Sequence, residues 1–125
     1  MFKHLTNDHR RLLGAAIAMA AADGTLTSQE LGAIDEIAEK LHLSPAARDE
    51  VAQMMACPPT PSQIAEWVVT EQDKVGVYAV AVRVAAADGR WDEAEQVLLN
   101  RLAAILNMTK EQVDQAERLG RGGES

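Results

Sequence analysis

Four carboxylates recur along the chain in a pattern that could bind a metal ion. Asp23 and Asp88 each follow three alanines and precede a glycine, and a glutamate stands seven residues after each aspartate, at Glu30 and Glu95. Carboxylate oxygens are the ligands that the hard cations Ca²⁺ and Mg²⁺ prefer. Since four adjacent carboxylates repel one another without a counter-charge, we predict that these four side chains converge on one or two divalent cations.

An Asp-Gly pair followed by a glutamate is also the second half of an EF-hand calcium loop. If the first Asp-Gly pair supplies loop positions 5 and 6, positions 1 and 3 fall on Met19 and Ala21, whose side chains do not bind calcium. The second pair fails in the same way, with Val84 and Ala86 at these positions. Neither copy is therefore a self-contained EF-hand, and any cation must be shared between the two copies.

A purely structural role for the same residues is the alternative. Thr27 and Glu30 have the spacing of a capping box, and Glu95 follows Asp92 at the same interval. A capping side chain contributes about 1 kcal/mol with no ligand, and an aspartate before glycine is a common turn residue. Helix N-termini also favour carboxylates and disfavour cations. Both interpretations stay open from the residues alone.

The elements that position these carboxylates are duplicated. The interval from Asp23 to Asp88 equals the interval from Glu30 to Glu95, and this repeat interval also aligns apolar positions such as Ile34 with Leu99. We therefore predict one domain over residues 1–125, with repeats at about 12–54 and 77–119. The proline-rich segment 57–61 is the expected joint, because prolines remove hydrogen-bond donors and disfavour helix in the preceding residue.

Every segment of the chain is expected to be helical, which predicts an all-α fold of about seven helices. Leu13, Ile17 and Ala20 have the spacing of a buried helix face. Caps, prolines and glycines mark the helix ends. Five of the expected helices span about 7–22, 28–41, 45–56, 72–87 and 93–106, and two more begin at 61 and at 110. The tail from Gly120 onward is expected to be frayed.

Composition limits the classes of partner. A formal charge of −7 repels phosphate groups, so we expect neither nucleic-acid binding nor binding to anionic membranes. A divalent cation or a basic protein partner fits this charge better. Of the 125 residues, 47% are apolar but 3% are aromatic, which favours closely packed helices rich in alanine and leucine.

The chain is expected to be cytoplasmic and without a membrane span. Cys57 is the single cysteine, so no intramolecular disulfide can form and a zinc–thiolate site has no support. Arg10 and Arg11 before the apolar run 12–22 resemble a secretory signal, but a similar run recurs at 77–87, which favours a core helix for both. Neither run approaches the ~20 residues that a bilayer requires.

No arrangement of residues indicates catalysis. His4, His9 and His42 share no ligand spacing, and no serine, cysteine or lysine has a recognisable base partner. We therefore predict that the protein is not an enzyme.

The doubled pattern Ala-x-Ala-Asp-Gly, with its glutamate and a helix pair ending in Leu-x-Leu-Ser or Leu-x-Met-Thr, resembles the TerB-like tellurite-resistance family. The resemblance covers roughly residues 12–119. It implies a seven-helix fold with internal pseudosymmetry and an acidic metal site, which carries over to the four carboxylates named above. It also implies a binding or scaffold module in a stress response, such as resistance to tellurite or phage.

Two functions follow from this reading. The first is a non-enzymatic module that binds Ca²⁺ or Mg²⁺ through carboxylates shared between the repeats. The second is a protein–protein interaction or scaffold domain, in which the same carboxylates are helix caps and an acidic face or apolar groove docks a protein partner.

Overall fold

The computed structural model describes residues 7–22, 28–86 and 93–121, and in these residues it contains seven α-helices and no strand. The all-α prediction is confirmed. No helix in these ranges is both long enough and apolar enough to cross a bilayer. The helices are α1 (Asn7–Ala20), α2 (Ser28–Lys40), α3 (Pro45–Ala56), α4 (Pro61–Glu66), α5 (Glu71–Ala85), α6 (Glu93–Ile105) and α7 (Lys110–Gly120).

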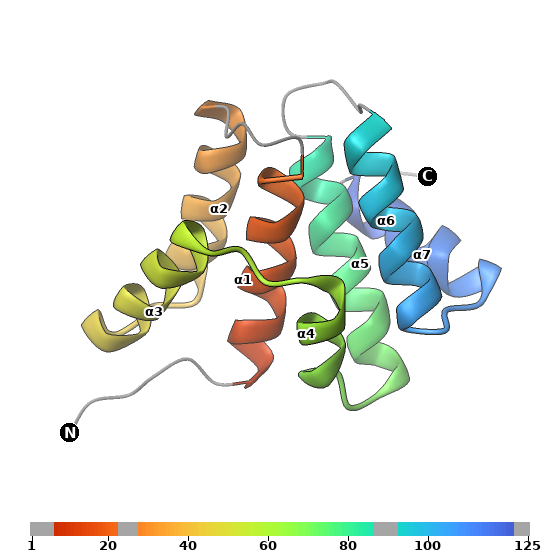
Figure 1. Ribbon diagram of the computed structural model, residues 1–125, viewed down its shortest axis with the longest axis horizontal. Helices are drawn as coiled ribbons and strands as arrows, with labels where there is room; N and C mark the ends of the chain where they lie inside the picture. Colours follow the sequence, from red (N-terminus) through yellow and green to blue (C-terminus); the bar gives the residue numbers. More distant parts are fainter. Residues whose placement is uncertain (1–6, 23–27, 87–92, 122–125) are drawn as a thin grey trace.

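Two helices, α1 and α5, pack side by side at the centre of the molecule (Figure 1). Helices α2 and α3 lie on the α1 side and α6 and α7 on the α5 side. The predicted face of Leu13, Ile17 and Ala20 is fully buried, and seven of the fifteen residues of α5 are buried as well. The run of residues 12–20 after Arg11 therefore forms a core helix. Its alanines let neighbouring helices approach closely, which suits a chain with few aromatic side chains.

Most helix starts lie where the sequence predicts them. Ser44 caps α3 before Pro45, and Thr60 caps α4 before Pro61. The break between these helices falls on the expected proline-rich segment. The predicted ends of the first and fifth helices, Ala22 and Ala87, are each two residues too late, because α1 and α5 end at Ala20 and Ala85. Residues 21 and 22 instead form a turn, in which the Ala22 N–H bonds the Met19 carbonyl.

Helix boundaries follow the repeat interval of the sequence. This interval relates the start and the end of α2 to those of α6, and the start of α3 to that of α7. It also relates His42 to Asn107, which have positive φ angles of 51° and 55°. Residues of these types are enriched in this left-handed conformation, which commonly ends a helix. The secondary structure therefore repeats, while a pseudo-twofold axis relating the repeats in space stays a prediction.

The C-terminal end of α7 is packed, so the expectation of fraying from Gly120 onward is wrong at this residue. Gly120 is buried and is the last residue of the helix. A Cβ atom built at Gly120 would lie 2.5 Å from the Ala79 carbonyl oxygen and 2.7 Å from Val82 Cβ. The missing side chain lets the backbone of α7 touch α5, and this contact holds the helix end in place.

Candidate metal centre at one end of the bundle

The segments that carry the predicted ligands leave the bundle at the same end. The C-terminal ends of α1 and α5 and the starts of α2 and α6 lie together at the top of Figure 1. Asp23 and Asp88 themselves lie outside the described residues, as does the side chain of Glu30, whose backbone is in the first turn of α2. The distances between the four carboxylates therefore stay a prediction.

Chain connectivity limits where the two aspartates can be. Asp23 is three residues beyond Ala20 and Asp88 is three residues beyond Ala85. Three extended residues span at most about 11 Å, and packed helix axes are about 8–10 Å apart. Because α1 contacts α5, these limits allow the two aspartates to approach one another. Both repeats can thus supply an acidic residue to the same site.

Glu95 is the one predicted ligand whose side chain the structure describes. It is the third residue of α6 and is 3% exposed. Glu95 and Arg11 are the only charged residues that are buried within the described ranges. A buried carboxylate requires positive charge or several N–H donors around it. A divalent cation supplies the first and the start of a helix supplies the second, so the burial of Glu95 is compatible with both interpretations.

No group of three or more His, Cys, Asp or Glu side chains that could hold a metal is found in residues 7–22, 28–86 and 93–121. The four-carboxylate site stays a prediction, since the structure does not describe three of its four side chains. His42 and Cys57 give no support for a second metal centre, because both are exposed and they lie beyond opposite ends of α3.

Three helices show how this chain caps helix starts without a ligand. Helices α4, α5 and α7 each begin with a complete capping box, whose third residues are Gln63, Asp73 and Gln112. The Thr60 N–H donates to Gln63 Oε1 at 2.9 Å, and the Gln63 N–H donates to Thr60 Oγ1 at 3.2 Å. Glutamine and aspartate both occupy the position that Glu30 and Glu95 have in their helices.

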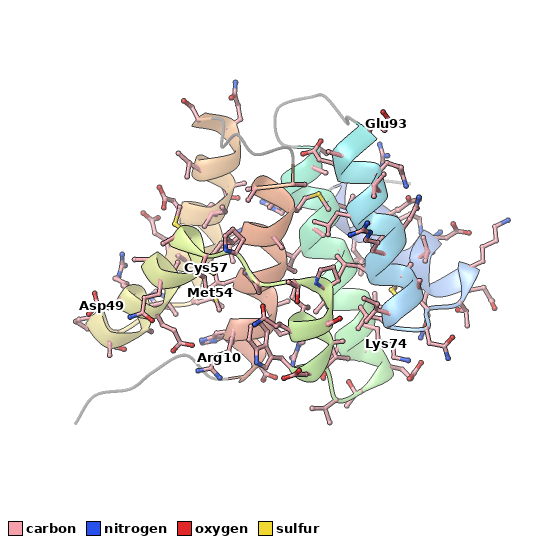
Figure 2. The ribbon with its side chains drawn as sticks, viewed as in Figure 1. Arg10, Asp49, Met54, Cys57, Lys74 and Glu93 are labelled. Carbon is pink, nitrogen blue, oxygen red and sulfur yellow. The ribbon has the colours of Figure 1, made fainter. Side chains whose placement is uncertain are left out.

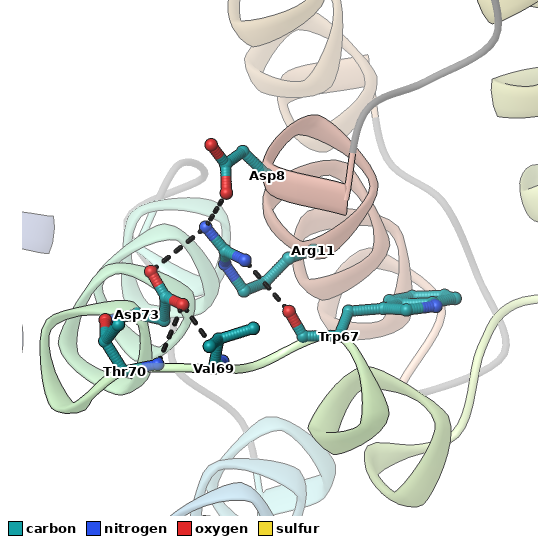
Figure 3. A network of polar contacts seen from close by, with 6 residues as sticks. All are labelled: Asp8, Arg11, Trp67, Val69, Thr70 and Asp73. Atoms are coloured by element: carbon teal, nitrogen blue, oxygen red, sulfur yellow. Dashed lines mark hydrogen bonds and ion pairs between the residues drawn. The ribbon is translucent and has the colours of Figure 1, made fainter.

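The most connected polar cluster lies at the opposite end of α1 and is centred on Arg11 (Figure 3). Its Nη1 donates to the Trp67 carbonyl oxygen at 2.9 Å. Its Nη2 lies 2.6 Å from Asp8 Oδ1 and 3.1 Å from Asp73 Oδ1. Arg11 Nε is buried and has no hydrogen-bond partner among the described residues. The cluster ties α1 to the junction of α4 and α5.

Asp73 has a second role in this cluster. Its Oδ2 accepts hydrogen bonds from the Val69 and Thr70 N–H groups, both at 3.0 Å. Burial raises the pKa of Asp73, but these hydrogen bonds and the Arg11 charge outweigh burial and lower its pKa below the usual value. The arrangement is a cap joined to an ion pair, and it presents no reactive group.

Sequence reasoning misses the structural role of Arg11, which it treats only as half of a basic pair before an apolar run. A usable signal is present, because Arg11 directly precedes the buried stripe and a cation inside an apolar helix face needs an acidic partner. The sequence does not reveal that this partner is Asp73, which lies in α5, in the other half of the chain.

The DUF533 family model, described as a protein of unknown function, matches residues 3–119. The chain belongs to the DUF533 family. The DUF533 match contains both predicted repeats and all four predicted ligands. No curated protein matches the chain, and no solved structure does either.

Proposed function

We propose that the protein is a TerB-like module that binds a divalent cation, with Ca²⁺ or Mg²⁺ favoured, and that it catalyses no reaction. Asp23, Glu30, Asp88 and Glu95 are the proposed ligands, and the proposed role is in a stress response of the tellurite-resistance type. The observation that supports this proposal is that α1 and α5, which precede the two Asp-Gly pairs in the sequence, are in contact and both end at the same end of the bundle (Figure 1).

Electrostatics supports a cation at this end. If the two aspartates and two glutamates converge as proposed, they carry four negative charges when ionised, and like charges within a few ångströms raise one another's pKa. A divalent cation offsets half of this charge. Ca²⁺ accepts six to eight oxygen ligands in flexible geometry, so bidentate carboxylates, backbone carbonyls and water would complete the shell.

Calorimetric titration of the metal-free protein with Ca²⁺, Mg²⁺, Mn²⁺ and Zn²⁺ tests the proposal. Trp91 fluorescence provides a second readout, because this residue is three positions after Asp88. We expect saturable binding that is lost when Asp23→Ala and Asp88→Ala are combined. A matched control combines Asp49→Ala and Asp114→Ala, which removes the same charge from exposed positions on α3 and α7. The absence of saturable binding up to millimolar cation would overturn the proposal.

The second candidate is a protein–protein interaction or scaffold domain in which the four carboxylates only cap helices and turns. The capping boxes of α4, α5 and α7 favour it, since they are complete without a cation. If this candidate is correct, the combined Asp23→Ala and Asp88→Ala variant unfolds at a lower temperature than the wild type by the same margin with and without added cation.

A further inference from the structure

Two surface grooves lie at matching positions of the two repeats. The first lies between α2 and α5, and its lining includes Gln29, Gly32, Ala33, Glu36 and Arg83. The second lies between α6 and α1, has a volume of about 460 Å³, and is lined by residues that include Ala18, Ala94, Val97, Leu98 and Arg101. The repeat interval relates each of these five positions of one groove to a position of the other. The grooves are thus two versions of one feature, and their differences are informative.

An ion pair crosses the first groove. Arg83 Nη2 lies 2.6 Å from Glu36 Oε1 across it, and this hydrogen bond and the Arg83 charge lower the pKa of Glu36. In the second groove Ala18 replaces Arg83 and Arg101 replaces Glu36. The second groove therefore has no corresponding ion pair among the described residues, and its lining combines the apolar Val97 and Leu98 with the charged Glu93 and Arg101.

Helix α6 exposes apolar side chains along the second groove and beyond it. Val97 is 45% exposed and Ile105 is 44% exposed. The corresponding residues of α2 are Gly32 and Lys40. Because α2 has the same length without a large apolar side chain at either position, the fold itself does not require Val97 and Ile105 to be apolar.

Charged residues stand on both sides of Val97 in a self-complementary order. Glu93, Val97 and Arg101 are spaced by four residues, so they form one row along α6. Glu93 lies at the start of the helix (Figure 2). Neither Glu93 nor Arg101 has an ion-pair partner among the described residues. When two such rows lie antiparallel with their Val97 residues opposite one another, each Glu93 faces an Arg101.

We propose that the second groove is a homodimer interface, in which α6 packs antiparallel against α6 of a second copy of this chain. A twofold axis near Val97 makes the two Val97 side chains neighbours and pairs Glu93 of each copy with Arg101 of the other. Helices that interdigitate their rows of residues i, i+4 and i+8 pack in the commonest crossing class of globular proteins. A twofold interface uses the same patch on both copies, as this row allows.

Charge reversal tests the pairing directly. Sedimentation velocity over a wide concentration range measures association of the wild-type chain, whose monomer mass is 13.5 kDa. Glu93→Arg alone and Arg101→Glu alone each place like charges opposite one another, so we expect each change to weaken the dimer by at least about tenfold. Mixing the two single variants restores both pairs, and a heterodimer is expected with wild-type affinity.

Controls separate the interface from general charge effects. Glu111→Arg and Arg118→Glu make equal changes at exposed positions of α7, and neither is expected to alter association. Val97→Asp is expected to abolish the dimer while leaving the circular dichroism spectrum unchanged. A wild-type chain that stays monomeric, an equal loss in the α7 controls, or no recovery when the single variants are mixed would each overturn the proposal. The cation site uses other residues, so its test can fail independently of this one.

Discussion

Replacing Arg11 with methionine removes the central group of the buried cluster between α1, α4 and α5 while keeping a side chain of similar length. The lost hydrogen bond to the Trp67 carbonyl is charge-assisted and is worth about 1.5–3 kcal/mol. The ion pair with Asp73 adds to this, because the Asp73 side chain is 19% exposed. The pair with Asp8 adds little, because Asp8 is 77% exposed and its charge is screened by water.

These contributions sum to about 2–4 kcal/mol, after allowing for the unpartnered Nε of Arg11, whose burial already costs stability. At an unfolding entropy of about 2.1 cal/mol/K per residue, this loss lowers Tm of a 125-residue domain by roughly 8–15 °C. Thermal unfolding followed by circular dichroism measures the shift. Urea unfolding gives the same free energy independently if the transition is two-state.

A double-mutant cycle distinguishes the two acidic partners of Arg11. Asp8 is the closer, at 2.6 Å against 3.1 Å for Asp73, so distance alone would rank Asp8 first. Burial predicts the reverse order. We expect a coupling energy of about 1–2 kcal/mol between Arg11→Met and Asp73→Asn, and below about 0.5 kcal/mol between Arg11→Met and Asp8→Asn. Equal couplings, or a cost of Arg11→Met below about 1 kcal/mol, would refute this reasoning.

Two further predictions concern the contact between α5 and α7. Gly120→Ala places a methyl group against the Ala79 carbonyl and Val82, so we expect a loss of about 1–3 kcal/mol in unfolding free energy. The control is Gly32→Ala, which has open space around its Cβ and should not destabilise the protein. Burial, and then the nearby Glu117 charge, raises the pKa of Tyr78 in the folded protein above its usual value of 10.0. As the pH rises, Tyr78 therefore ionises first in the unfolded chain, so its contribution to the free energy of unfolding is complete below about pH 10 and is lost above it. Tyr78→Phe should remove this loss of stability at alkaline pH. Because the chain has one tyrosine, phenolate absorbance reports the titration directly.

Local signals are sufficient to predict the helices. Ser44-Pro45, Thr60-Pro61 and Thr109 mark helix starts by side-chain caps, which act within three residues and can be recognised in the sequence. The ends of α1 and α5 are predicted too late because alanine is the strongest helix former, so the alanines at these ends favour continuing the helix. Alanine carries no stop signal, so the position of these ends is decided by tertiary packing.

Contacts between distant segments cannot be predicted in this way. Gly120 resembles a flexible tail residue, and its burial follows from the close approach of α5 at Ala79, much earlier in the chain. Arg11 likewise depends on the junction of α4 and α5. For the candidate site, the sequence predicts which four carboxylates could converge, and the structure places the ends of α1 and α5 and the starts of α2 and α6 at one end of the bundle.

Thermal unfolding tests the proposed cation site most directly. Tm is measured for protein prepared metal-free, before and after addition of Ca²⁺ or Mg²⁺, and the wild type is compared with the combined Glu30→Gln and Glu95→Gln variant. Glutamine preserves a helix cap, as Gln63 and Gln112 do in this chain, but it removes the negative charge that a cation requires. At a cation concentration about 100 times Kd, binding adds about 2.7 kcal/mol, or roughly 10 °C in Tm. We predict this shift in the wild type and its absence in the variant, whose Tm without cation is no lower than that of the wild type because two mutually repelling charges have been removed. No shift in the wild type, or an equal shift in both proteins, would contradict the account.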